Sequence, residues 1–115
     1  MVFVHTIDLA DRGALHTAVQ RAADALLGLT RQLGLEPGPS GIAVNSVAPC
    51  FVLCNLAKQR QWESYGPEGQ QRLIESIQTR RMGRPQDVAD ALVFLASVAA
   101  SWISGQILSV DGGRS

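Results

Sequence analysis

A long amphipathic segment is the feature that most constrains what this chain can fold into. From Asp11 onward, apolar residues recur at spacings of four and three, which is the period of one helix face. The pattern predicts a helix of about 24 residues that begins near Asp11, whose carboxylate suits an N-cap. The residues of the predicted apolar stripe are Leu15, Val19, Ala22, Leu26, Leu29 and Leu33. The proline- and glycine-rich residues 37–41 end this helix in a turn.

Short apolar runs on both sides of the helix predict strands. Residues 2–9 form the first run, and neither of its faces is strongly polar, so it would have to be covered on both sides. Residues 42–48 form a second strand, which Pro49 ends. Residues 102–110 form a third, which Asp111-Gly112-Gly113 closes.

The remaining segments predict one irregular stretch and two helices. Residues 50–67 are expected to be irregular, and residues 70–79 to form a helix. A better marked helix begins at Pro85, which suits a first helical position, and Asp87 favours the positive end of its dipole. Its predicted buried stripe consists of Val88, Ala91, Leu92 and Leu95. The order of elements predicts an α/β fold with parallel pairing, because crossovers of this length commonly connect parallel strands.

Length, charge and hydropathy exclude several classes of protein. A chain of 115 residues forms one small domain at most. Ten Lys plus Arg balance ten Asp plus Glu, which argues against a nucleic-acid or anionic-membrane surface. No stretch approaches the ~20 apolar residues of a membrane-spanning helix, and the first residues lack a signal peptide's basic region. We therefore expect a soluble, cytoplasmic protein.

Several side chains carry alternative interpretations. Cys50 and Cys54 could form a metal or redox pair, but two thiols with His5 and His16 far away in sequence do not complete a zinc site. We therefore predict no metal site. The arginines at positions 80, 81 and 84 would either bind a phosphate or form solvated charge before a helix. Both tryptophans, Trp62 and Trp102, are expected to be packing residues.

Three contiguous motifs stand out along the chain. They are residues 44–49, Val-Asn-Ser-Val-Ala-Pro; residues 81–89, Arg-Met-Gly-Arg-Pro-Gln-Asp-Val-Ala, followed by residues 93–97; and residues 103–113, Ile-Ser-Gly-Gln-Ile-Leu-Ser-Val-Asp-Gly-Gly. Together they resemble the short-chain dehydrogenase/reductase family, in its 3-oxoacyl-acyl-carrier-protein reductase branch. The first motif resembles the strand and turn that lead into the nicotinamide half of the family's cofactor site, and the third resembles the closing strand. In this order and spacing the motifs are highly specific.

The resemblance also implies an internal junction. Residues 1–26 resemble the family's third strand and helix, whereas residues 27–115 resemble the C-terminal part of its fold, with the junction near Ala25–Gly28. Two strands and their helices are therefore expected to be missing at the junction, and two further strands before Met1. A natural deletion, an engineered one and a frameshift or sequencing error are alternative origins. The resemblance thus implies a single partial domain over residues 1–115, with a partial Rossmann-type, doubly wound parallel sheet and flanking helices.

The family's cofactor is NAD(P), and the resemblance places the residual cofactor contacts at Asp8, Pro49, Cys50, Val52 and Cys54. After Pro49 the family usually has a glycine that gives the nicotinamide close access, and Cys50 replaces it here. Cys54 replaces the family's usual threonine, so both changes weaken the retained contacts. The glycine-rich turn that holds the pyrophosphate is absent. The resemblance implies that Asp8 contacts the adenine of the cofactor. The alternative is that Asp8 ends a strand or caps a helix, since a carboxylate in such a place needs no ligand.

The residues of the family's hydride-transfer chemistry are not found. The resemblance places its Tyr and the Lys four residues later at Val19 and Ala23, neither of which can titrate. In the family, the Lys charge lowers the Tyr pKa from its ordinary value of ~10. Tyr65 does not substitute, because Gly69 stands four residues later and the only lysine, Lys58, precedes it. The chain is thus an NAD(P)-dependent oxidoreductase of carbonyls or alcohols by descent, with no catalytic residues predicted and its status as an enzyme left open.

The competing prediction is a non-catalytic interaction or oligomerisation module, or a gene remnant without a selected role. The helix stripe of residues 15–33 is close to a heptad seam, so it would pack either on the chain's own sheet or on another chain. In the family's sheet order, the retained strands lie at opposite ends. Joined directly, they would present unpaired edges. We therefore expect a homo-oligomer or pairing with another chain.

Overall fold

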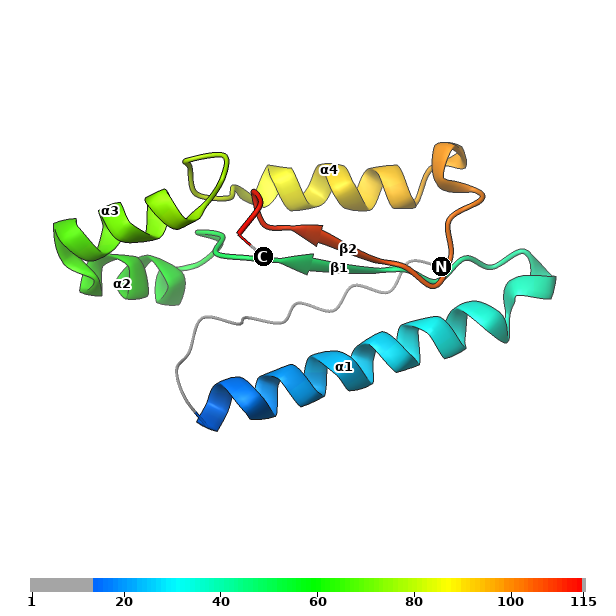
Figure 1. Ribbon diagram of the computed structural model, residues 1–115. Helices are drawn as coiled ribbons and strands as arrows, with labels where there is room; N and C mark the ends of the chain where they lie inside the picture. Colours follow the sequence, from blue (N-terminus) through cyan, green and yellow to red (C-terminus); the bar gives the residue numbers. More distant parts are fainter. Residues whose placement is uncertain (1–13, 115) are drawn as a thin grey trace.

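Two parallel strands form the centre of the computed structural model, which describes residues 14–114 (Figure 1). Strand β1 comprises Ser46–Pro49 and strand β2 comprises Ile107–Val110, and their register aligns Ser46 with Ile107. The predicted α/β class and parallel pairing are therefore confirmed. The predicted strand over residues 2–9, the N-cap at Asp11 and the adenine contact at Asp8 lie outside the described residues.

Both strands are shorter than predicted, because side chains replace the backbone ladder at their amino ends. Asn45 is 1% exposed, and its Oδ1 accepts the Gln106 N–H at 3.1 Å while its Nδ2 donates to the Ile103 carbonyl at 2.9 Å. The Val44 N–H donates to the Ser104 hydroxyl at 3.2 Å. These bonds, with a backbone bond from the Gly105 N–H to the Val44 carbonyl at 2.7 Å, hold residues 44–45 and 103–106 together without regular strand pairing. At the other end, the structure includes Pro49 in β1 instead of ending the strand before it.

Helix α1, Ala14–Leu35, covers one face of the sheet (Figure 1). Thr30 is 5% exposed, and its hydroxyl lies 2.7 Å from the Ser46 hydroxyl. A side chain on Gly34 would come within 2.9 Å of the Gly105 backbone, so glycine allows this close approach. The helix therefore meets the sheet through Thr30 and Gly34. For this reason Leu29, from the predicted apolar stripe, remains 48% exposed.

Helix α4, Pro85–Leu95, covers the opposite face, because Ser46 faces α1 and successive strand residues point to opposite faces (Figure 1). Val47 is fully buried and packs with Leu95 and Ala100 in the core. The partly buried residues around this cluster are Val88, Leu92, Ile103 and Val110. The predicted start of α4 at Pro85 is confirmed. Of the predicted buried stripe, Leu95 is buried, Val88 and Leu92 are partly buried against the core, and Ala91 is only half-buried. A short 3₁₀ helix, η2 at Val98–Ala100, follows α4.

Residues 50–67 are not irregular as predicted, since most of them belong to helices. Helix α2 comprises Leu56–Ser64, and helix α3 comprises Gly66–Ser76, which begins and ends earlier than the predicted helix over residues 70–79. The side chain of Asn55 caps α2 by accepting the Lys58 N–H at 2.9 Å. Gly66, with φ of 63°, makes the turn between the two helices. The surface of α2 is mostly polar, so no apolar period indicated it in the sequence.

A turn follows the end of α1. A second 3₁₀ helix, η1 at Gly38–Ser40, and Gly41 at φ of 73° form the predicted turn after α1. Within residues 14–114, no helix is both long enough and apolar enough to cross a membrane.

Candidate functional site at the carboxyl ends of the strands

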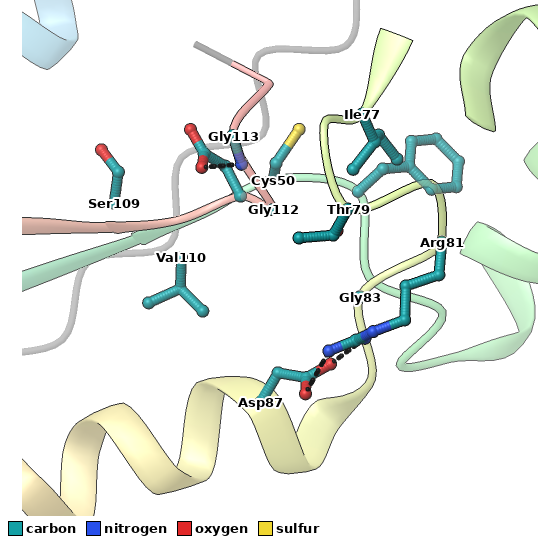
Figure 2. A pocket seen from close by; sticks show the side chains of 12 residues that line it. Cys50, Ile77, Thr79, Arg81, Gly83, Asp87, Ser109, Val110, Gly112 and Gly113 are labelled. Carbon is teal, nitrogen blue, oxygen red and sulfur yellow. Dashed lines mark hydrogen bonds and ion pairs between the residues drawn. The ribbon is translucent and has the colours of Figure 1, made fainter. Parts of the chain in front are cut away.

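A cavity of about 280 Å³ lies where β1 and β2 end (Figure 2). The strands are parallel, so the segments that follow them meet at the same edge of the sheet, which is where α/β folds bind ligands. Cys50 and Phe51 line the cavity from the segment after β1, and residues 109–113 from the end of β2. Residues between Ile77 and Asp87 complete the wall. The sheet topology thus assembles one candidate site from three distant parts of the chain.

The glycine pair at positions 112–113 holds one wall in place. The Gly112 carbonyl accepts the Thr79 N–H at 3.0 Å, and the Asp111 carboxylate accepts the Gly113 N–H at 2.8 Å. A Cβ on Gly112 would lie 2.6 Å from the Thr79 hydroxyl oxygen, and its φ of 64° also favours glycine. Residues 111–113 therefore pack directly against residues 77–79.

An ion pair forms the opposite wall (Figure 2). Arg81 donates to the two carboxylate oxygens of Asp87 at 2.7 and 3.0 Å, and Asp87 also accepts the backbone N–H of Arg84 at 2.7 Å. The hydrogen bond from Arg81 is the main cause that holds the pKa of Asp87 well below its usual range. Asp87 in turn raises the pKa of Arg81, chiefly through the same hydrogen bond. The opposite charges compensate each other, so this wall adds little net charge to the cavity.

The contacts of Asp87 also decide between the two interpretations of the arginines at positions 80, 81 and 84. Both Arg81 and Arg84 pair with Asp87, and an Arg80 nitrogen donates to the Glu75 carbonyl oxygen. Each guanidinium therefore has a partner within the chain. This arrangement favours a structural role at the start of α4 over a phosphate site.

Of the four predicted cofactor residues within the described part of the chain, the structure brings only Cys50 into the cavity. Half-buried Cys50 lines it, and its sulfur accepts a hydrogen bond from an Arg114 nitrogen at 3.4 Å. Pro49 belongs to β1, and Val52 is only 9% exposed and forms a bridge with Gly83. Cys54 is exposed and precedes the cap of α2, away from the residues that line the cavity.

These positions do not fit the nicotinamide half of a dinucleotide. At the position where the family's pattern has a glycine, the Cys50 side chain stands in contact with Arg114. Val52 is packed so tightly that a Cβ on Gly83 would lie 3.0 Å from one of its methyl groups. Cys54 offers an exposed thiol instead of the hydroxyl expected at its position. We therefore derive no chemical step through a nicotinamide cofactor.

The chain's only tyrosine and only lysine lie on α2 and at its end, outside the cavity lining. The Tyr65 hydroxyl accepts from the Gln61 amide at 2.8 Å, and Gln61 accepts from the Lys58 ammonium at 3.3 Å. The Lys58 ammonium also lies 5.3 Å from the centre of the Phe51 ring, and partial burial lowers its pKa. Trp62 packs at 6.4 Å from the same ring, as its predicted packing role requires. The arrangement is an aromatic cluster with a neutral amide between Tyr65 and Lys58.

Sequence reasoning missed Gln61 and Arg114 as partners in these contacts. The i, i+3 and i+7 spacing of Lys58, Gln61 and Tyr65 would have indicated one helix face if α2 had been recognised. No local signal connects Arg114 with Cys50, because only the parallel pairing of β1 with β2 brings them together. Among residues 14–114, no group of three or more His, Cys, Asp or Glu side chains is placed to hold a metal ion.

The fold and cavity define a class of protein: the C-terminal part of a Rossmann-type unit, with helices on both faces of parallel strands. The sequence profile described as Enoyl-(Acyl carrier protein) reductase matches residues 3–115. The chain belongs to the short-chain dehydrogenase/reductase family, which confirms the resemblance of its motifs.

Two curated relatives illustrate the similarity. The chain is 42% identical over 85 residues to 7alpha-hydroxysteroid dehydrogenase of Escherichia coli strain K12, covering 74% of this chain and 32% of the relative. It is 38% identical over 103 residues to the (2S)-[(R)-hydroxy(phenyl)methyl]succinyl-CoA dehydrogenase subunit BbsD of Thauera aromatica, covering 90% of this chain and 40% of the relative. The chain thus spans between a third and two fifths of the length of these relatives.

Solved structures agree with this assignment. A hydroxysteroid dehydrogenase from Escherichia coli superposes with a TM-score of 0.81 at 35% identity, over 99% of this chain and 45% of that one. A 7alpha-hydroxysteroid dehydrogenase complexed with NADH and 7-oxo glycochenodeoxycholic acid superposes with a TM-score of 0.78, also at 35% identity. That match covers 97% of this chain and 43% of the other, so the shared fold is the part that this chain retains.

Proposed function

We propose that this chain is a non-catalytic member of the family, which transfers no hydride and acts through contacts with protein chains. One observation carries the proposal: the positions that resemblance assigns to the family's acid/base pair hold Val19 and Ala23. Both positions lie within the chain, so residues before or after this sequence would not change which side chains stand there. Neither an alkyl group nor a methyl group can donate or accept a proton.

The aromatic cluster offers no replacement for that pair. A phenol acts as an acid near neutral pH only when its pKa falls well below ~10, and a nearby positive charge is the usual cause. Between Tyr65 and Lys58 stands the uncharged Gln61 amide, which donates to the hydroxyl oxygen. A positioned proton donor contributes roughly 10²–10⁴-fold to the rate of such a reaction. Without one, we expect no measurable turnover of carbonyl or alcohol substrates.

The second candidate is a working NAD(P)-dependent oxidoreductase. The 42% identity to 7alpha-hydroxysteroid dehydrogenase favours it, as does the NADH complex of a similar structure. The two candidates differ in a measurable property, because an enzyme of this kind must bind the dinucleotide. Cys50 and Val52 argue against such binding by this chain.

Titration with NADH and NADPH tests the proposal. We expect no saturable change in nucleotide fluorescence and no thermal shift up to about 1 mM dinucleotide. The Escherichia coli 7alpha-hydroxysteroid dehydrogenase serves as the positive control under the same conditions. A dissociation constant in the micromolar range for this chain would overturn the proposal and favour the second candidate.

We also propose a homo-oligomer or a pairing with another chain, without nucleic-acid or membrane partners, in the cytoplasm. The balance of ten basic and ten acidic residues supports the exclusion of nucleic-acid and membrane partners. A short parallel sheet with an exposed edge supports the need for a protein partner. A chain that shows no cooperative thermal unfolding would instead favour a gene remnant.

A further inference from the structure

Strand β1 is buried like a strand in the middle of a sheet, although β2 is the only strand beside it among residues 14–114. The exposed fraction is 1% for Asn45, 7% for Ser46 and 0% for Val47. In β2, by contrast, Leu108 and Ser109 are exposed. A strand at the edge of a sheet leaves a row of backbone groups open to solvent. The burial of β1 therefore indicates that a further segment covers the edge that faces away from β2.

The backbone groups on that covered edge belong to Asn45 and Val47. The Ser46 N–H donates to the Gln106 carbonyl at 2.8 Å, so Ser46 bonds toward β2. Along a strand, residues that bond to one neighbour alternate with residues whose N–H and carbonyl point to the other side. The N–H and carbonyl groups of Asn45 and Val47 thus point away from β2, and they have no hydrogen-bond partner among residues 14–114. Because nearly all buried backbone groups in native proteins are paired, these groups need a partner.

Helix α1 begins on the side of the molecule toward which both strand arrows point (Figure 1). Near its other end, Thr30 and Gly34 contact the amino ends of the strands. The helix has 22 residues and is about 33 Å long, so its first residue, Ala14, lies toward the carboxyl ends of the strands. The chain therefore enters α1 from the edge of the sheet at which a third parallel strand would end.

Residues 2–9, which lie outside the described residues, have a sequence that suits such a strand. Neither of their faces is strongly polar, and α1 and α4 cover both faces of the sheet. At the usual rise of a strand they span about 26 Å, which is also the reach of residues 42–49. Residues 10–13 remain for the connection to α1, a usual length between a strand and a helix.

We propose that residues 2–9 of this chain form a third strand, parallel to β1, which pairs with Asn45 and Val47 on the edge opposite to β2. Strand, α1 and β1 then form one βαβ unit. Resemblance to the family's third strand implies the far end of the sheet for the same segment, so this pairing belongs to the joined chain. It goes beyond the proposed function, because it does not depend on whether the chain binds a cofactor.

The pairing also adds a charged group to the edge that holds the cavity. Parallel strands end at the same edge of a sheet, and ligands bind at that edge. Asp8 stands near the end of residues 2–9, as Cys50 stands directly after β1. The third strand therefore brings the Asp8 carboxylate to the edge of the sheet where Cys50 lines the cavity.

Nuclear magnetic resonance of the full 115-residue chain tests the pairing. We expect the amide hydrogens of Asn45 and Val47 to exchange with solvent at least about a hundredfold more slowly than in an unstructured peptide. We also expect nuclear Overhauser contacts between the backbone hydrogens of residues 2–9 and those of residues 45–49.

Val4→Pro and His5→Pro separate the pairing from other causes of slow exchange. Neighbouring strand residues direct their N–H groups to opposite edges, so one variant removes a bond to β1 and the other removes none. We expect the first to speed exchange at Val47 at least about tenfold and the second to have little effect. The Ala48 N–H faces β2 and is the internal control, which should stay protected in both variants.

Three results would overturn the pairing: fast exchange at both Asn45 and Val47, no contacts between residues 2–9 and 45–49, or equal effects of the two proline variants. A mixed sample of differently labelled chains adds a fourth. Contacts found only between the two labels would assign the third strand to a second copy, which would also overturn pairing within one chain. Binding of NADH would refute the proposed function and leave the third strand standing.

Discussion

Asp87 organises the start of α4 and one wall of the cavity through a single carboxylate. It accepts the Arg84 N–H at the first turn and pairs with the guanidinium of Arg81. A charge at a helix N-terminus also interacts favourably with the helix dipole. The same side chain therefore links the segment after α3 to the helix that covers the sheet.

The lowered pKa of Asp87 predicts a pH dependence of stability. Because the pKa is lower in the folded chain than in the unfolded one, the contribution is complete above pH ~4 and is lost as the pH falls below it. We expect Asp87→Asn to lower the free energy of unfolding near neutral pH, and the gap to the wild type to narrow steadily as the pH falls below ~4. Urea unfolding at several pH values measures this difference. A constant gap between the two proteins at all pH values would contradict it.

Asp90→Asn is the matched control for that series. Asp90 lies on the same helix, but its carboxylate accepts from the Gln86 amide instead of an arginine. Its substitution should leave the acid side of the stability profile largely unchanged.

At the residue scale, the sequence predicts roles that depend on local position. Pro85 and Asp87 were identified as the start of a helix because capping rules act within one turn. The contact between Arg114 and Cys50 spans 64 positions and depends on the strand register, which no local rule supplies. The exposure of Trp102 was predicted wrongly, since a residue's average burial does not say which surface a particular chain leaves uncovered.

At the scale of elements, Asn45 joins β1 to the segment that precedes β2. Its amide makes two hydrogen bonds inside the protein, and both partners would be left unpaired without it. We expect Asn45→Ala to lower the free energy of unfolding by about 2–3 kcal/mol. Asn55→Ala, which removes the exposed cap of α2, should cost only about 1 kcal/mol. Chemical denaturation of both variants measures the difference, and equal losses would refute the ranking.

The elements differ in how well they could be predicted. Helices α1 and α4 each have an apolar period that is visible in the sequence, although α1 meets the sheet through Thr30 and Gly34. Helix α2 lacks such a period and depends on the Asn55 cap and on Phe51, to which Trp62 and Tyr65 turn their rings. The predicted strands over residues 42–48 and 102–110 contain β1 and β2 but are too long, because Asn45 and Ser104 make side-chain bonds at their amino ends.

At the scale of the whole molecule, a two-stranded sheet with helices on both faces is a small structural unit. Isolated pairs of strands are marginal in water, and a partner that binds only the folded form raises its stability. The motifs were specific enough to predict the family and the α/β class, since each is a contiguous run of residues. Unpaired edges were predicted from the family's sheet order, and the pairing of β1 with β2 shows which edge of β2 has no strand beside it among residues 14–114.

The proposed homo-oligomer predicts that thermal stability depends on protein concentration. We expect the midpoint of thermal unfolding to rise by several degrees between about 5 and 100 µM chain, because dissociation accompanies unfolding. Differential scanning fluorimetry across the concentration series provides the measurement. A midpoint independent of concentration would contradict a homo-oligomer linked to folding.

The pairing of β1 with β2 also determines when in folding the sheet can form. Asn45 and its partner on Gln106 are 61 positions apart, so every bond of the sheet closes a long loop. Helices α2, α3 and α4 lie within that loop and need only local contacts to begin. We therefore expect helices to begin to form while the backbone groups of β1 are still unsatisfied. Such forms are the ones in which this small protein is most exposed to aggregation, and their lifetime depends on the rate at which a single long loop closes.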